Sequence, residues 1–152
     1  MVSGGRACVV RIGQYALGID GAFTRQVHGL NELRRVPRAP GALAGFFASR
    51  SQVIPIVVLE PLLNLPVPKH ELAVQLEYSG RQFGVGIDAV LGFIPLQARS
   101  ADAPFALAHL VEGSMAFGEQ TVPMLSMPKV LEQLSVALGP APARAVPLTP
   151  DL

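Results

Sequence analysis

The stretch that decides the fold runs from residue 45 to residue 65 and reads GFFASRSQVIPIVVLEPLLNL. Two runs of apolar and β-branched residues are separated by a short polar segment, which predicts a β-hairpin over residues 46–59. Pro55 interrupts the second run and predicts an edge strand or a bulge, because proline cannot donate a hydrogen bond to a β-ladder. Arg50 is at the apex of this hairpin. It is either presented to a binding partner or is a solvated turn residue.

Length and composition limit the class of protein. A chain of 152 residues, half of them apolar and 15% charged, is typical of one globular domain with a sizeable core. The net charge of +1 provides no general attraction to nucleic acid or to anionic membranes. Cys8 is the single cysteine and fits a reducing compartment. We expect a cytoplasmic protein, because the sequence shows no signal-peptide pattern and no apolar run near 20 residues.

Short apolar runs alternate with glycine, proline and polar turn residues along the chain, which predicts a mainly β fold. We expect a short helix over residues 20–27, capped by Asp20, and a loop over residues 30–40. A terminal helix is expected over residues 127–138 with Ser126 as its N-cap. We assign residues 1–138 to one domain and expect the Pro/Ala-rich residues 139–152 to be disordered. The other predicted strands cover residues 8–12, 15–19, 72–78, 82–87, 93–96, 115–117 and 121–125.

Two segments of the chain resemble each other. Residues 13–20, GQYALGID, and residues 80–88, GRQFGVGID, each lead from a turn through an aromatic and apolar strand to Gly-Ile-Asp. The similarity is either that of ordinary hairpins or the sign of two related β units. In the second interpretation, about ten short strands form two small barrels that share a core.

An ordered set of motifs covers residues 7–136. The segments are Tyr15 to Ile19, Thr24 to Val27, and residues 33–40, 45–51, 55–60, 86–92, 111–113 and 122–126. Together these motifs resemble the CheW-like domain family. The resemblance implies two small SH3-like five-stranded β-barrels packed on a shared core, with short helices and a C-terminal helix. It also implies a non-catalytic adaptor that couples chemoreceptors to a CheA-type histidine kinase in bacterial chemotaxis or motility signalling.

The resemblance places the partner-binding surface around the hairpin arginine and the segment that follows the first strand pair. The chain departs from the family pattern here, because Ser49 and Ser51 replace a leucine and a glycine. Val58 replaces a carboxylate and Glu60 replaces an arginine, at positions that the resemblance assigns to partner-facing surfaces. The predicted partner-binding residues are Arg50, Phe46, Gln52, Gln26, Val27, His28 and Leu30.

Candidate catalytic and metal-binding residues are sparse. His28, His70 and His109 lack metal-ligand spacing, and we expect all three at the surface. Cys8 is in an apolar strand and is expected in the core. Asp20 and Asp88 are either a carboxylate pair or separate strand-end residues. We therefore expect no enzymatic activity, no cofactor and no metal.

The alternative function is a small β-barrel that binds a ligand or nucleic acid without a signalling role.

Overall fold

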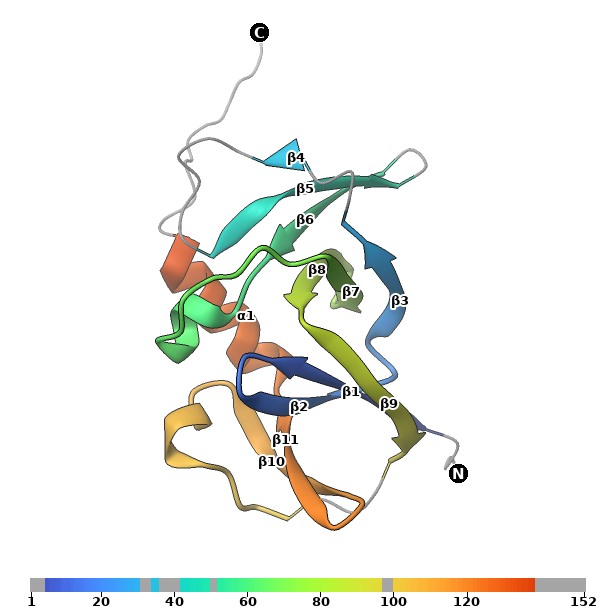
Figure 1. The fold of residues 1–152 in the computed structure, drawn as a ribbon, viewed down its shortest axis with the longest axis vertical. Helices are drawn as coiled ribbons and strands as arrows, with labels where there is room; N and C mark the ends of the chain where they lie inside the picture. The colour runs from blue at the N-terminus through green and yellow to red at the C-terminus, as the bar shows by residue number, and fades with distance from the viewer. Residues whose placement is uncertain (1–4, 31–33, 36–41, 50–51, 97–99, 139–152) are drawn as a thin grey trace, which may run out of the picture.

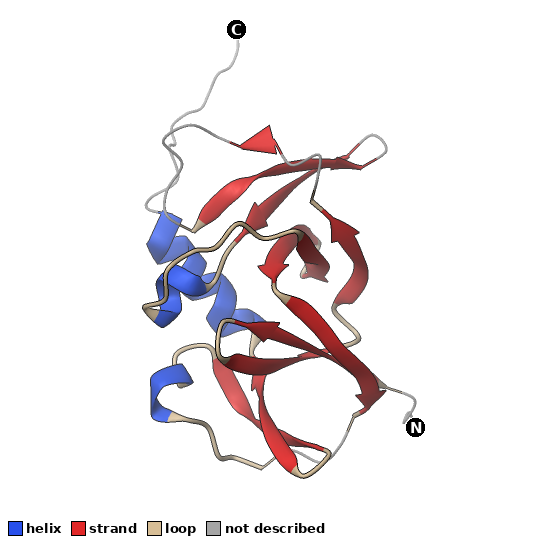
Figure 2. Cartoon of the chain, in the orientation of Figure 1, coloured by secondary structure: helices blue, strands red, loops and turns tan. Residues whose placement is uncertain are grey.

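The computed structural model describes residues 5–30, 34–35, 42–49, 52–96 and 100–138. Within these residues the chain is mainly β, with eleven strands, two short 3-10 helices and one α-helix (Figure 1). Figure 2 shows the helical segments gathered along one side of the strands. The mainly β class and the C-terminal helix predicted from the sequence are confirmed.

The first sheet contains five strands, in the spatial order β10-β11-β2-β1-β9. Neighbouring strands are antiparallel except for β11 and β2, which are parallel. Ser100, which follows β9, forms a bridge with Ser114 of β10, so the two ends of this sheet approach each other. Its strands are β1 (Arg6–Ile12), β2 (Tyr15–Asp20), β9 (Ala89–Pro95), β10 (Val111–Phe117) and β11 (Gln120–Leu125).

The second sheet contains six strands, in the spatial order β3-β7-β8-β6-β5-β4. Its parallel pair is β6 and β8. The ring centroids of His28 on β3 and Phe47 on β5 are 4.7 Å apart, so this sheet curls until its first strand approaches the last strand but one. Its strands are β3 (Thr24–Gly29), β4 (Arg34–Arg35), β5 (Leu43–Ser49), β6 (Gln52–Val57), β7 (Leu72–Tyr78) and β8 (Arg81–Ile87).

The chain crosses between the sheets at the two segments that resemble each other in sequence. β2 ends at Asp20, after which β3 joins the other sheet; β8 ends at Ile87, and β9 joins the other sheet after Asp88. The first sheet therefore combines the β1–β2 hairpin with three strands from the second half of the chain, and the second sheet combines the β7–β8 hairpin with four strands from the first half. The topology supports the interpretation of two related β units.

Equivalent glycines allow the parallel strands to approach closely in both sheets. Gly18 is paired with Met124, and Gly84 is paired with Ile56. A Cβ atom on either glycine would collide with the side chain of its partner. The strands that carry these partners, QVIPIV in β6 and QTVPML in β11, also share one burial pattern. Similar local packing thus recurs in the two sheets.

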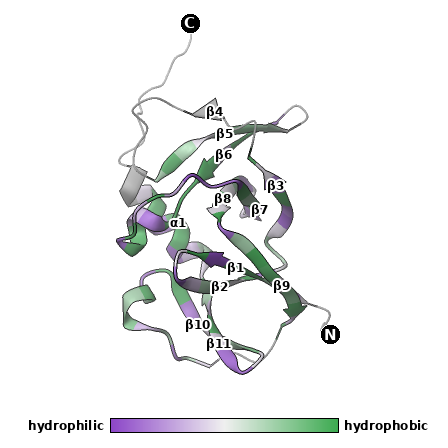
Figure 3. Cartoon of the chain, in the orientation of Figure 1, coloured by the Kyte–Doolittle hydropathy of each residue, from purple (hydrophilic) through white to green (hydrophobic). Residues whose placement is uncertain are grey.

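One apolar core joins both sheets to the helix α1 (Met127–Leu138). Cys8 and Ile12 contribute from the first sheet, Val74 and Val85 from the second, and Leu134 from α1. Hydrophobic residues dominate most strands, whereas hydrophilic residues mark the turn between β10 and β11 (Figure 3). The shared core makes the two sheets one packing unit.

The helix α1 begins at Met127, where the sequence predicts it. The backbone N–H of Lys129 donates to Ser126 Oγ at 3.3 Å, and Val130 N–H donates to the Ser126 carbonyl at 2.8 Å. A side-chain oxygen at this position satisfies a donor that the first helical turn leaves unpaired. Ser126 is therefore the N-cap, as predicted.

Two sequence predictions about local structure are wrong. The predicted helix over residues 20–27 is a turn followed by β3, because residues 24–29 pair with β7 and complete the edge of its sheet. The Asp20 carboxylate accepts a hydrogen bond from Ala22 N–H at 2.9 Å, which stabilises that turn instead of a helix. In the predicted loop over residues 30–40, Arg34 and Arg35 form the two-residue strand β4, which adds a sixth strand to the second sheet.

Among the described residues, no helix has the length and apolar character needed to span a membrane.

Candidate functional site

The predicted partner-binding residues are in the second sheet and beside it. Phe46 is on β5 and half-buried, opposite Pro55 of β6, and Gln52 is exposed at the start of β6. The flanking residues Ser49 and Gln52 are paired, whereas Arg50 is outside the described residues. Thus Phe46 and Gln52 belong to one hairpin, as the sequence predicts.

The other predicted partner residues differ in their exposure. Gln26 is exposed on β3, and Val27 is half-buried against the shared core. His28 is half-buried and forms a 2.6 Å hydrogen bond with Gln75 Oε1. Leu30 is buried with Ile54 in a small cluster inside the second sheet. Among the predicted partner residues that the structure describes, Gln26 and Gln52 are therefore the exposed ones, and Leu30 is buried.

Among the described residues, a group of three His, Asp or Glu side chains lies elsewhere, and the sequence pattern did not indicate it. It consists of Glu60, His70 and Asp88, and we call it the Glu60–His70–Asp88 cluster. Glu60 begins the 3-10 helix η1 (Glu60–Leu63), His70 precedes β7, and Asp88 is at the crossing from β8 to β9. Three separate parts of the chain thus bring these side chains together.

His70 is between the two carboxylates. Its Nε2 atom donates to Glu60 Oε2 at 2.7 Å, and its Nδ1 atom is 3.3 Å from Asp88 Oδ1. The side chains of His70 and Glu60 are 3% and 1% exposed, and that of Asp88 is 24% exposed. Asp88 Oδ2 also accepts a 2.8 Å hydrogen bond from Gly13 N–H, which links the cluster to the β1–β2 turn.

The environment of His70 favours its protonated form. Burial alone lowers the pKa of His70, because it removes water from the imidazolium ion. The hydrogen bond to Glu60, the charges of Glu60 and Asp88, and the backbone of Ile87 outweigh burial and raise the pKa above the ordinary value. The cluster can therefore hold a proton, and its donor types are also those of a transition-metal site.

Three expectations about these positions are wrong. His70 is buried, not at the surface, because it pairs with carboxylates that are distant in sequence. Val58 and Glu60 are buried as well, at 2% and 1% exposure, so neither belongs to a partner-facing surface. No local spacing connects Glu60, His70 and Asp88, and only knowledge of the sheet crossing would have joined them. Asp88 is therefore a member of a buried network and not a simple strand-end residue.

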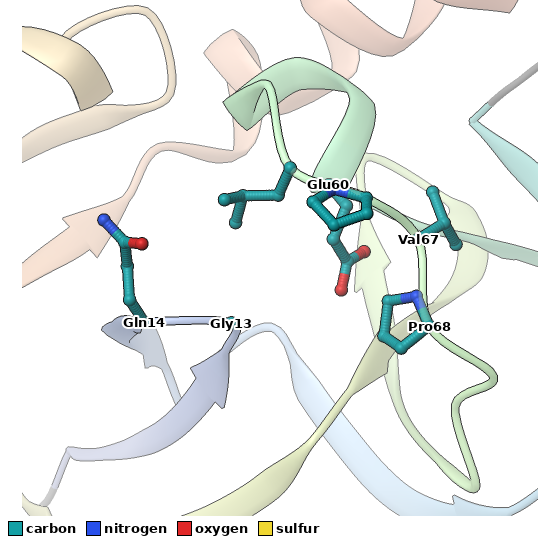
Figure 4. A pocket seen from close by; sticks show the side chains of 7 residues that line it. Gly13, Gln14, Glu60, Val67 and Pro68 are labelled. Carbon is teal, nitrogen blue, oxygen red and sulfur yellow. The ribbon is translucent and has the colours of Figure 1, made fainter.

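A pocket of about 280 Å³ adjoins Glu60 (Figure 4). Figure 4 shows the Glu60 carboxylate between Pro68 and the turn that carries Gly13 and Gln14. The pocket is mostly apolar, and the full lining consists of Gly13, Gln14, Glu60, Leu65, Pro66, Val67 and Pro68. The pocket therefore lies next to the buried Glu60 carboxylate.

The remaining candidate residues have structural roles. Cys8 is buried in the core, as predicted, and burial raises the pKa of its thiol to about 11. A thiol with so high a pKa is a poor nucleophile near neutral pH. His28 and His109 are half-buried, not at the surface, and His109 Nε2 donates to the Leu62 carbonyl at 2.7 Å. Cys8 thus contributes to core packing, and His28 and His109 each form a hydrogen bond within the fold.

Comparison with known proteins identifies one family. The family model described as "CheW-like domain" matches residues 6–135. Among solved structures, the chain is similar to the scaffolding protein TtCheW from Thermoanaerobacter tengcongensis, with a TM-score of 0.72 and 17% sequence identity. The alignment covers 84% of this chain and 87% of that one. Among curated proteins, no sequence matches.

Proposed function

The chain belongs to the CheW-like domain family, and from this premise we propose that it is a non-catalytic adaptor in bacterial chemotaxis or motility signalling. In this role it binds the regulatory domain of a CheA-type histidine kinase and the cytoplasmic tip of a methyl-accepting chemoreceptor. The observation that carries the proposal is the family match over residues 6–135, which spans both sheets and most of α1. The proposal implies a cytoplasmic location.

The arrangement of the second sheet supports the choice of binding surface. Gln26 on β3 and Gln52 on β6 are exposed, and the neighbouring Val53 is 68% exposed although apolar. Exposed apolar side chains beside polar ones are a common feature of protein interfaces. We propose that the partner contacts the β5–β6 hairpin and that Arg50 pairs with a carboxylate of the partner.

The test is capture of the kinase and receptor encoded beside this gene by wild-type protein and by Arg50→Glu. Surface substitutions commonly change stability by less than about 0.5 kcal/mol, so Arg50→Glu is expected to fold. We expect partner binding to weaken by about 2 kcal/mol or more if the charge pair is desolvated in the complex. The measurement is the dissociation constant, at equal melting temperature.

The matched control is Arg11→Glu, which reverses the charge of an arginine that is exposed on β1 of the first sheet. We expect this variant to bind both partners as the wild type does. Unchanged binding by Arg50→Glu would refute the role of Arg50. Failure of the wild-type protein to bind either partner would refute the adaptor function itself.

A further inference from the structure

The two buried side-chain atoms that lack a hydrogen-bond partner among the described residues both belong to the Glu60–His70–Asp88 cluster. They are Glu60 Oε1 and His70 Nδ1. Buried polar atoms in folded proteins are nearly always hydrogen-bonded, and exceptions indicate strain, a functional group or an absent ligand. Of the two, His70 Nδ1 is 3.3 Å from Asp88 Oδ1, and a ligand bound to both of these atoms would satisfy it.

The charges in the cluster identify that ligand as a cation. Two carboxylates surround one imidazole, and the ion pairs among the described residues place no lysine or arginine against any of the three. A proton on His70 leaves the two carboxylates with one negative charge in excess, whereas a divalent ion bound to neutral His70 balances both, and buried excess charge is costly. Mixed histidine and carboxylate donors are typical of transition-metal sites.

We propose that the cluster is a binding site for a divalent transition-metal ion of the Zn²⁺ type, with His70 Nδ1 and Asp88 Oδ1 as ligands. These two atoms are 3.3 Å apart, and with metal–ligand bonds of about 2.1 Å they subtend about 105° at the ion, near the tetrahedral angle. Asp88 is 24% exposed, so water can complete the coordination from that side.

Glu60 has the orienting role in this site. Its Oε2 atom accepts the hydrogen bond from His70 Nε2 at 2.7 Å, which leaves the Nδ1 lone pair available to the metal. Metal-bound histidines commonly donate their second ring N–H to a carboxylate in this way. One ligand atom from each of the three residues is within 4.8 Å of the others. Glu60 thus completes a carboxylate–histidine–metal arrangement.

The backbone holds the ligands in place before the ion binds. A Cβ atom at Gly86 would be 2.7 Å from His70 Cδ2, so the imidazole packs directly on the β8 backbone. Gly13 N–H donates to Asp88 Oδ2 at 2.8 Å and fixes the second ligand. A bound ion therefore joins the connection before β7, which carries His70, to the sheet crossing, which carries Asp88.

The first test is titration of the chelator-treated wild-type protein with Zn²⁺, followed by calorimetry and thermal unfolding. We expect one ion per chain, and a melting temperature that rises by roughly 5–10 °C at a hundredfold excess over the dissociation constant. Mg²⁺ is the control ion, because it prefers oxygen ligands in octahedral geometry and is expected to produce no rise. Less than stoichiometric Zn²⁺ uptake by wild type would overturn the proposal and leave a proton on His70 as the cation of the cluster.

The second test removes the ligands one at a time. We expect His70→Gln and Asp88→Asn to abolish stoichiometric Zn²⁺ binding and Glu60→Gln to weaken it by about 10- to 100-fold. Glu132→Gln is the control, since it neutralises an exposed carboxylate on α1 and is expected to retain the wild-type affinity for Zn²⁺. Equal Zn²⁺ binding by folded His70→Gln and wild type would also overturn the proposal.

A third measurement keeps the proposal testable if a variant does not fold. Wild-type protein loaded with Co²⁺ is expected to show visible absorption that differs from that of the aqueous ion, because nitrogen and oxygen ligands replace water. If folded wild-type protein mixed with Co²⁺ shows only the spectrum of the aqueous ion, the proposed metal site is wrong.

Discussion

Position 86 requires glycine because the His70 ring packs directly against its backbone. The His70 ring occupies the space that any larger side chain at position 86 would fill. Glu60 and Asp88 hold that ring from either side, so it cannot move away without breaking the cluster. The glycine and the histidine are therefore coupled.

Gly86→Ala is accordingly expected to destabilise the protein by about 1–3 kcal/mol, the usual cost of overpacking a filled interior. Gly29→Ala is the matched control, because a Cβ atom on this β3 glycine meets no atom within 4 Å. It is expected to be neutral or to stabilise by up to about 1 kcal/mol through the unfolded state. Urea unfolding of both variants provides the measurement, and equal midpoints for the two would show that the His70 ring moves freely.

At the residue scale, prediction from the sequence succeeded where the cause was local. Ser126 was identified as an N-cap because its partner, Lys129 N–H, is three residues away. The positions of Glu60 and His70 could not be predicted, because ten residues separate them and the buried hydrogen bond that joins them leaves no local pattern. Lys69 and Glu71 beside His70 favoured a surface loop, whereas tertiary charge pairing determined its burial.

At the scale of elements, β3 shows how tertiary pairing overrides local preference. Asp20 is a good helix cap, yet residues 24–29 pair with β7 in a register interrupted by a bulge. The edge of β7 offers unpaired backbone groups, and a strand satisfies them where a helix would not. Hairpins such as β7–β8 were predictable because their turn signals and apolar runs are adjacent in sequence.

The helix α1 is expected to owe its stability to the core and not to its own sequence. Leu134→Ala removes a side chain that is 4% exposed in the shared core, and we expect it to cost about 2–5 kcal/mol. Glu132→Ala changes an exposed position of the same helix and is expected to stay within about 0.5 kcal/mol of the wild type. Chemical denaturation followed by circular dichroism compares the two, and similar losses for both would mean that α1 does not depend on the core contact.

At the scale of the whole molecule, the two sheets are expected to unfold as one unit because they share one core. The chain has no tryptophan and two tyrosines, so tyrosine fluorescence can report on each sheet separately. Tyr15 is on β2 of the first sheet and Tyr78 is on β7 of the second. Tyr78→Phe leaves the first reporter, and Tyr15→Phe leaves the second.

We expect each variant to unfold with the same midpoint by tyrosine fluorescence as by circular dichroism. This is the result for a two-state transition. In the Tyr78→Phe variant, Tyr15 fluorescence is not expected to change before the circular dichroism does. A change in fluorescence at a denaturant concentration that leaves the circular dichroism native would show that the sheets unfold independently. The comparison within each variant removes the effect of the substitution on overall stability.

The exchange of hairpins between the halves of the chain has a consequence for cleavage of the backbone. A protease that cuts between η1 and β7 would separate β1–β6 from β7–β11 covalently. Each sheet, however, contains strands from both fragments, and β6 is hydrogen-bonded to β8 across the cut. The nicked protein would therefore elute as one particle in native gel filtration and separate into two bands only after denaturation.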